Sequence, residues 1–190
     1  VQDKRLKDQL KVLNDEYEPA GFSFDLINTT RTKNSRWAKW SDRTDRDMKE
    51  ALRQGVQNTL NVFFVPSMSV GLGGGVLGVC AIPFTSVAYD GCVILNSAMT
   101  GPGSKAPFNE GKTAVHEVGH WLGLWHVFDI TCLGAGDLID DTTPQSMATL
   151  GCNTTQDSCE GGLKDNIHNF LDYSDDACMN EFTPGQVKRM

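Results

Sequence analysis

The chain has 190 residues and lacks any apolar run near the roughly 20 residues that a membrane-spanning helix needs. It also lacks a signal peptide, because it opens with the charged run Val1-Gln2-Asp3-Lys4-Arg5. We therefore expect no membrane span, and a mature chain from which a targeting segment has been removed. Basic residues are too few for nucleic acid to be the main partner, since 17 Lys and Arg against 24 Asp and Glu give a net charge of −7.

Length and composition are those of a globular protein. With 39% hydrophobic residues, the chain can form one domain or two closely packed subdomains. The acidic excess lies at the end of the chain, because residues 126–190 hold 11 acidic and 3 basic side chains. Bound calcium, a preference for basic substrates, and solubility alone all fit that excess.

Six cysteines without a C-x-x-C pair fit disulfides better than a zinc knuckle. Three bridges would place the protein outside the cytosol. The spacing alone leaves 15 connectivities open. Two glycosylation sequons, at Asn28 and Asn153, also fit a secreted chain.

Four segments are expected to be helical. Residues 3–16 carry leucines at helical spacing, and residues 42–57 place Met48, Leu52 and Val56 on one apolar face. A helix over 110–123 would begin at Asn109 as its N-cap. A last helix opens at Thr183-Pro184, an N-cap followed by proline at the first helical position.

Four strands are expected between these helices. The alternation of Phe22, Phe24 and Leu26 indicates a half-buried strand. The others span residues 60–65, stopped by Pro66, then 76–82 and 92–96. A G-x-G-x-x-G match at 73–78 is not a dinucleotide site, because no helix follows it, and these glycines instead predict a mobile loop.

The strongest feature is the run from His116 to His126, which has the form H-E-x-x-H-x-x-G-x-x-H. On a helix, His116 and His120 project from one face about one turn apart. Gly123 allows a sharp turn that returns His126 to them. Three such ligands leave one tetrahedral position open, which is typical of catalytic zinc.

Glu117 is expected to be the general base of this site. It would take a proton from a zinc-activated water and deliver it to the leaving amine of a cleaved peptide. The alternative is a core helix whose histidines are only hydrogen-bonded, and three of the four histidines falling within one motif weighs against it. The fourth, His168, is interpreted as structural.

Three parts of the sequence together resemble the pappalysin family of metzincin metallopeptidases, especially secreted fungal and bacterial members. They are the zinc motif, the segment 169–174 (Asn-Phe-Leu-Asp-Tyr-Ser) and the tail 178–186 (Cys-Met-Asn-Glu-Phe-Thr-Pro-Gly-Gln). The resemblance is specific over about residues 110–190. Residues before 110 fit the layout only loosely.

The resemblance implies an α+β fold with a twisted mixed sheet, backing helices and a zinc helix in residues 1–123. Residues 124–190 would form a small, irregular, disulfide-linked subdomain, and the two together one catalytic domain with the substrate cleft between them. By the same resemblance the bridges would be Cys132–Cys159, Cys152–Cys178 and Cys80–Cys92.

The resemblance also implies roles for residues around the zinc. Leu171 occupies the turn beneath the metal, where the family has methionine, and we expect activity to survive because the two side chains have similar volumes. Tyr173 would reach the metal region and support the tetrahedral intermediate, and a packed core tyrosine is the alternative. Substrate would extend along the strand at Gly78, Val79, Cys80 and Ala81 by strand addition.

Two further features leave alternatives open. Asp137, Asp140 and Asp141 have the oxygen-rich character of a calcium loop without an EF-hand pattern, and solvated turn carboxylates fit equally well. Asp175 and Asp176 would favour Arg or Lys after the cleaved bond if they line that pocket. If residue 177, an alanine, lined that pocket, it would not favour Arg or Lys.

The sequence thus predicts a secreted, monomeric zinc endopeptidase that acts on polypeptides, with calcium as a second candidate metal. One rival is a catalytically weak or silent zinc-binding module of the same fold. Another is a zinc hydrolase with a non-peptide substrate. Intact Glu117 and all three histidines weigh against the silent module.

Overall fold

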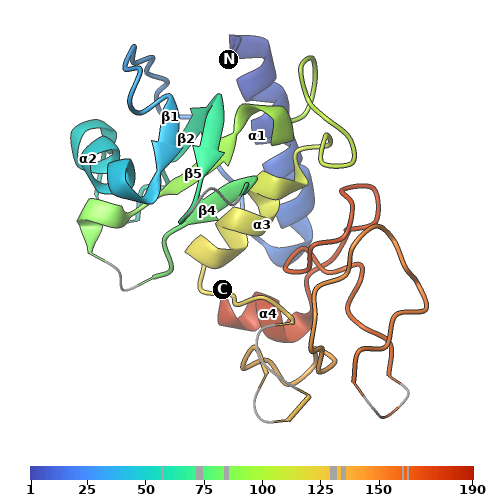
Figure 1. The fold of residues 1–190 in the computed structure, drawn as a ribbon. Coiled ribbons are helices and arrows are strands. Elements are labelled where there is room, and N and C mark those ends of the chain that lie inside the picture. The colour runs from blue at the N-terminus through green and yellow to red at the C-terminus, as the bar shows by residue number, and fades with distance from the viewer. Residues whose placement is uncertain are drawn as a thin grey trace.

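The computed structural model describes residues 1–190 except 57, 72–74, 84–85, 129–131, 134–135, 160 and 162. Regular elements dominate up to Trp121, and the rest is irregular until a short last helix (Figure 1). The upper half of Figure 1 holds the strands and three helices, and the lower half holds the loops and α4. The glycine run at 73–78 lies partly outside the described residues.

The helices are α1 (Asp3–Tyr17), α2 (Asp42–Leu52), α3 (Lys112–Trp121) and α4 (Pro184–Arg189). Short 3-10 turns span Glu18–Ala20, Val87–Tyr89 and Asn96–Ala98. The expected first helix is confirmed, and so is the start of the last. At that start Thr183 Oγ1 accepts a hydrogen bond from Gln186 N at 3.1 Å, and the Gln186 side chain completes a capping box.

The second helix is shorter than expected. It ends at Leu52, after which Arg53 leaves helical geometry and pairs with Asp90 at 2.6 Å. Gly55 then takes a positive φ of 79°, which turns the chain away from the helix axis. Val56 is consequently 70% exposed, so assigning it to the apolar face was wrong.

The strands form two small sheets instead of one. Strands β1 (Lys39–Ser41) and β3 (Ser67–Ser69) pair in parallel. Strands β2 (Val62–Val65), β5 (Cys92–Leu95) and β4 (Gly78–Cys80) form a mixed sheet in that order. Pro66 separates β2 from β3 because proline has no N–H to continue a ladder.

The central strand β5 divides the interior into two cores. Its side chains alternate between faces, so Cys92 and Ile94 join one core while Val93 joins the other. The larger core combines residues of α1, α3 and the C-terminal segment, including Leu13, Val118 and Phe170. This core contains residues from both halves of Figure 1. The C-terminal segment around Phe170 therefore packs directly against the helix that carries the zinc motif.

No strand forms at residues 22–26, so that prediction was wrong. The alternation does bury Phe22 and Phe24 partly, and both pack edge-on against Tyr17, with ring centroids 6.3 and 5.4 Å away. The backbone at Phe24, however, pairs with a helix side chain: the Asn14 amide accepts from its N–H and donates to its carbonyl. That pairing replaces the ladder that a strand would need.

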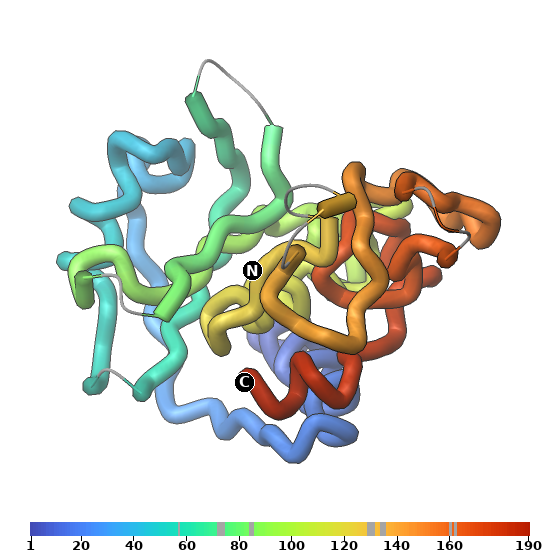
Figure 2. Tube along the Cα trace, turned by 90° about the horizontal axis from the view of Figure 1, so that it is seen from below, coloured from blue at the N-terminus to red at the C-terminus, as the bar shows by residue number. Residues whose placement is uncertain are grey.

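The C-terminal third is held by disulfides and by contact with α1. Cys132–Cys159 and Cys152–Cys178 lie within it, while Cys80–Cys92 joins paired residues of β4 and β5. These are the pairings that the resemblance implies. In Figure 2 the red C-terminal segment lies beside the blue end of α1, where Tyr17 and Phe182 rings are 5.0 Å apart.

Among the described residues, no helix combines the length and the apolar character that crossing a membrane would require.

Candidate metal centre and active site

Helix α3 presents the first two motif histidines on one face, with His116 in its middle and His120 next to its C-terminal end. Both precede Gly123, whose φ of 97° turns the chain back. The turn is fixed by a hydrogen bond from Leu124 N to Gly119 O at 3.0 Å. The helix is two residues shorter at each end than expected. Asn109 is not its N-cap, a position that Gly111 occupies.

The three motif histidines converge on one point. Their Nε2 atoms are 3.1 Å (His116–His120), 3.2 Å (His116–His126) and 3.0 Å (His120–His126) apart. Three nitrogens about 2.0–2.1 Å from a tetrahedral zinc would be about 3.3 Å apart. Within the described part of the chain, these histidines form the only cluster of three or more His, Cys, Asp or Glu with metal-ligand spacing.

Backbone carbonyls fix the proton positions of two of these rings. His116 Nδ1 lies 2.7 Å from Phe170 O, and His120 Nδ1 lies 2.9 Å from Leu124 O. A carbonyl can only accept, so each Nδ1 carries the hydrogen and each Nε2 directs a lone pair at the shared point. This electron-rich triangle suits a divalent cation.

Burial keeps His116 and His126 neutral, as metal ligands must be. Desolvation, followed by the neighbouring His120 and His126, holds the pKa of His116 well below its usual value. Desolvation, followed by His120, lowers the pKa of His126 to about 3. The neutral imidazoles of His116 and His126 are therefore ready to bind a metal across the physiological pH range.

Glu117 lies on the buried side of α3 and faces the edge strand β4. It is 6% exposed, and burial raises its pKa to about 8, with Lys49 acting in the opposite direction. A Cβ added to Gly78 would be 2.7 Å from Glu117 Oε1. The start of β4 therefore approaches the carboxylate as closely as only a glycine permits.

Strand β4 is an edge of the three-stranded sheet. Its described pairing is to β5 alone, which leaves its other side without a strand partner among the described residues. Gly78, Val79 and Cys80 belong to the strand and Ala81 follows it, with Ala81 N donating to Gly91 O at 3.4 Å. An extended peptide could pair with this edge beside Glu117.

The segment 170–173 crosses beneath the histidines. Leu171 is fully buried and packs against α3, where a Cβ on Gly119 would lie 3.1 Å from its Cδ2. Tyr173 is 44% exposed, and its ring centroid lies 5.6 Å from that of His116 and 5.0 Å from that of His126. Tyr173 is thus a surface residue beside the cluster and not a packed core tyrosine.

One aromatic neighbour escaped the sequence analysis. The Phe128 ring stacks on His126 at 4.6 Å with planes 11° apart, and it meets Tyr173 edge-on. Its only signal in the sequence is an aromatic two residues after the last motif histidine. His168 lies outside the cluster, as expected, with Nδ1 donating to Cys178 O at 2.7 Å.

The three aspartates of the candidate calcium loop have different surroundings. Asp137 is buried, and its Oδ1 accepts from Thr142 Oγ1 and Ile139 N. Asp141 accepts from Thr183 Oγ1 at 2.6 Å and from Gly185 N at 2.8 Å, so it stabilises the start of α4. Asp140 is exposed. These contacts give Asp137 and Asp141 structural roles, and a calcium site here stays a prediction.

Asp176 is fully buried, which argues against the idea that it lines a substrate pocket. Its Oδ2 accepts from Glu110 N at 2.8 Å and from Lys112 N at 3.4 Å, at the start of α3. Asp175 is half-buried, and its backbone N donates to Gly151 O. The contacts of Asp176 were not anticipated, because Glu110 and Lys112 are more than 60 residues away in sequence.

Sequence comparison shows that the chain is similar to known metallopeptidases. A family model of the M43 peptidases, described as pregnancy-associated plasma protein-A, matches residues 42–190. Extracellular metalloprotease 1 of Coccidioides posadasii is 47% identical over all of this chain and 68% of its own length. Extracellular metalloprotease of Pyricularia oryzae is 48% identical over all of this chain and 66% of its own length.

Solved structures agree with the sequence comparison. Mature mirolysin of Tannerella forsythia, in complex with a cleaved peptide, covers all of this chain and 83% of its own. It is 29% identical, with a TM-score of 0.82. Mirolysin in complex with a small compound is 30% identical, with the same coverage and TM-score.

Proposed function

We propose, from the premise that this chain belongs to the M43 family of metallopeptidases, that it is a secreted zinc endopeptidase with Glu117 as its general base. The observation that carries the proposal is the triangle of Nε2 atoms, 3.0–3.2 Å apart, next to a buried carboxylate. Relatives named extracellular metalloproteases and the three disulfides support secretion.

His116, His120 and His126 would hold the zinc through Nε2. Bound there, zinc supplies a Lewis acid that polarises a carbonyl and lowers the pKa of a water molecule. Phe170 O and Leu124 O keep two of the rings oriented by accepting their Nδ1 hydrogens. Leu171 supplies the apolar floor against which α3 packs.

Glu117 would move the proton between the attacking water and the leaving group. Its carboxylate takes the proton from the water and returns it to the amine nitrogen of the cleaved bond. Tyr173, exposed beside His116 and His126, would donate its hydroxyl hydrogen to the oxygen that becomes negative in the transition state.

The substrate would be a polypeptide in extended form along β4. The edge at Gly78, Val79, Cys80 and Ala81 offers backbone groups for strand addition, and the close approach of Gly78 brings that edge to Glu117. We further propose that residues 1–123 and 124–190 act as two parts of one catalytic domain. Their shared core supports this view.

The deciding experiment compares casein and peptide-library cleavage by the wild type and Glu117→Gln, with zinc content measured in both. We expect one zinc in each and a loss of about 10²–10⁴-fold in cleavage for the variant, because the proton transfer is lost while the ligands remain. The matched control is Glu181→Gln, an exposed glutamate, which should cleave like the wild type.

Two results would overturn this proposal. Full activity of Glu117→Gln would remove the general base from the mechanism. A zinc-loaded wild type that cleaves no peptide would instead indicate the silent zinc-binding module.

A further inference from the structure

The start of α3 is closed by a residue from a distant part of the chain. Its N-cap is Gly111, which has a φ of 85° and no side chain to accept the free amide hydrogens there. The first turn of a helix leaves such amides without intrahelical partners. Asp176 meets part of this need, because its Oδ2 accepts from Lys112 N, the first amide of the helix, and also from Glu110 N just before the N-cap.

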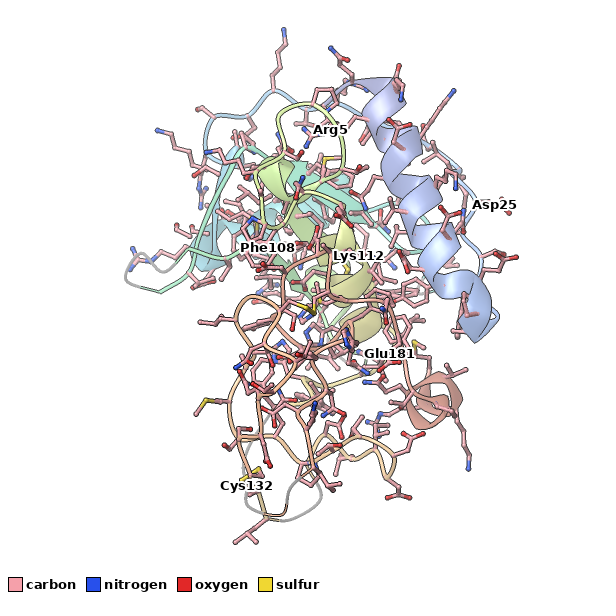
Figure 3. All side chains as sticks on the ribbon, turned by 90° about the vertical axis from the view of Figure 1, so that its right-hand side faces the viewer. Arg5, Asp25, Phe108, Lys112, Cys132 and Glu181 are labelled. Carbon is pink, nitrogen blue, oxygen red and sulfur yellow. A yellow bond between two sulfur atoms is a disulfide. The ribbon has the colours of Figure 1, made fainter. Side chains whose placement is uncertain are left out.

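A second contact joins the same two segments. Lys112 Nζ donates to Met179 O at 2.8 Å and also pairs with Glu16 of α1 at 2.9 Å. Figure 3 labels Lys112 where the upper part of α3 adjoins the C-terminal segment. The segment that runs beneath the histidines is therefore fastened to the helix start by both a side chain and a backbone carbonyl.

The contacts of Asp176 and Met179 with the start of α3 lie one helical turn from a candidate zinc ligand. His116 follows Lys112 by four residues, and its Nδ1 donates to Phe170 O in the same C-terminal segment. We propose that Asp176 is a positioning residue, which holds the start of α3 against the 170–179 segment and so fixes His116 relative to Leu171 and Tyr173. This inference rests on the proposed zinc peptidase function.

The environment of Asp176 supports a functional reason for its presence. The side chain is fully buried, and among the described residues nothing donates a hydrogen bond to its Oδ1. Burial is the largest cause that raises its pKa to about 6. At neutral pH the buried charge of this carboxylate therefore lowers the free energy of unfolding. Buried polar groups that destabilise a protein in this way are concentrated at functional sites.

The test uses Asp176→Ala and Asp176→Asn in the full chain. Zinc affinity is measured by competition with a chelator, and kcat and KM on one peptide that the wild type cleaves. We expect Asp176→Ala to bind zinc at least about tenfold more weakly and to lose kcat about tenfold with KM nearly unchanged, as is typical when a ligand's support is removed. Asp176→Asn keeps an acceptor oxygen and should stay within about threefold of the wild type.

The matched control is Thr183→Ala, which removes the N-cap of α4, a helix that does not carry the histidines. It should lower the melting temperature while zinc affinity and kcat stay at wild-type values. If Asp176 were merely structural, its alanine variant would behave in the same way. If Asp176→Ala fails to fold, Asp176→Ser replaces it, because the shorter serine side chain cannot reach both amides. We expect the same losses of zinc affinity and kcat from this variant.

Wild-type zinc affinity and kcat in the alanine variant would refute the positioning role. Equal losses in the Thr183→Ala control would also refute it. The chelator competition does not depend on catalysis. If the wild type bound zinc but cleaved nothing, the proposed function would fail while the effect of Asp176 on the histidine cluster could still be measured.

Discussion

At the scale of single residues, Leu171 forms the floor beneath the histidines, where the family resemblance led us to expect methionine. Leu171 is fully buried, its carbonyl accepts from Val127 N at 3.3 Å, and its side chain packs on α3 at Gly119. None of these contacts uses a sulfur atom. The position therefore needs an apolar side chain of this volume, which leucine and methionine both provide.

We predict that Leu171→Met changes kcat/KM less than tenfold and leaves the zinc content at one per chain. Exchanging side chains of similar volume in a packed core usually costs less than about 1.5 kcal/mol of stability. Peptide cleavage and metal analysis of the purified variant test this expectation. A hundredfold rise in turnover at constant zinc content would show that the methionine has a role beyond packing.

At the scale of elements, the start of α3 should make the stability of the fold depend on pH. The pKa of Asp176 rises from 3.8 to about 6 on folding, because burial outweighs the hydrogen bonds from the helix amides and Glu110 adds repulsion. Between these values the native state holds a proton that the unfolded chain has released. Raising the pH through this window therefore lowers the free energy of unfolding, by an amount on the order of 3 kcal/mol.

The Asp176→Asn variant lacks this titration. Urea unfolding of both proteins from pH 4 to 6.5 should show the variant gaining stability relative to the wild type as the pH rises. Asp175→Asn removes the same charge from the neighbouring half-buried position and is the control. Curves for Asp176→Asn and wild type that stay parallel across this range would contradict the assigned environment.

At the scale of the whole molecule, the irregular C-terminal third depends on its two disulfides. Cys152–Cys178 ends within the segment that carries Asp176 and Met179, whereas Cys132 lies at the far end of the lower half in Figure 3. The two bridges close loops of similar length, with separations of 26 and 27 residues. Loop-closure entropy then gives each about 3 to 4 kcal/mol of stability.

Replacing both cysteines of either bridge by serine should therefore lower the unfolding free energy by a similar amount, measured in urea. Zinc content and activity should distinguish the two variants. We expect the Cys152/Cys178 variant to lose zinc and peptidase activity at urea concentrations well below its midpoint of unfolding. The Cys132/Cys159 variant should keep both. Equal loss of zinc from the two variants would show that the bridge does not act through the segment beneath the histidines.

The sequence alone predicted those structural features that depend only on residues close to one another in the chain. The spacing within 116–126 predicted the convergence of three histidines, because helical periodicity and one glycine turn determine it. Leucine periodicity predicted α1, and the Thr183-Pro184 pair predicted the start of α4. The disulfide pairings came from family resemblance, since spacing alone left 15 connectivities open.

Tertiary structure decided the features that depend on partners distant in sequence. The alternation at Phe22 and Phe24 was real, but Asn14 took the backbone groups that a neighbouring strand would have used. The N-cap of α3 is Gly111 and not the predicted Asn109, and the first helical amide, Lys112 N, donates instead to the buried carboxylate of Asp176, 64 residues further along the chain. Local sequence thus determined which groups could bind a metal, whereas long-range packing determined what holds them in place.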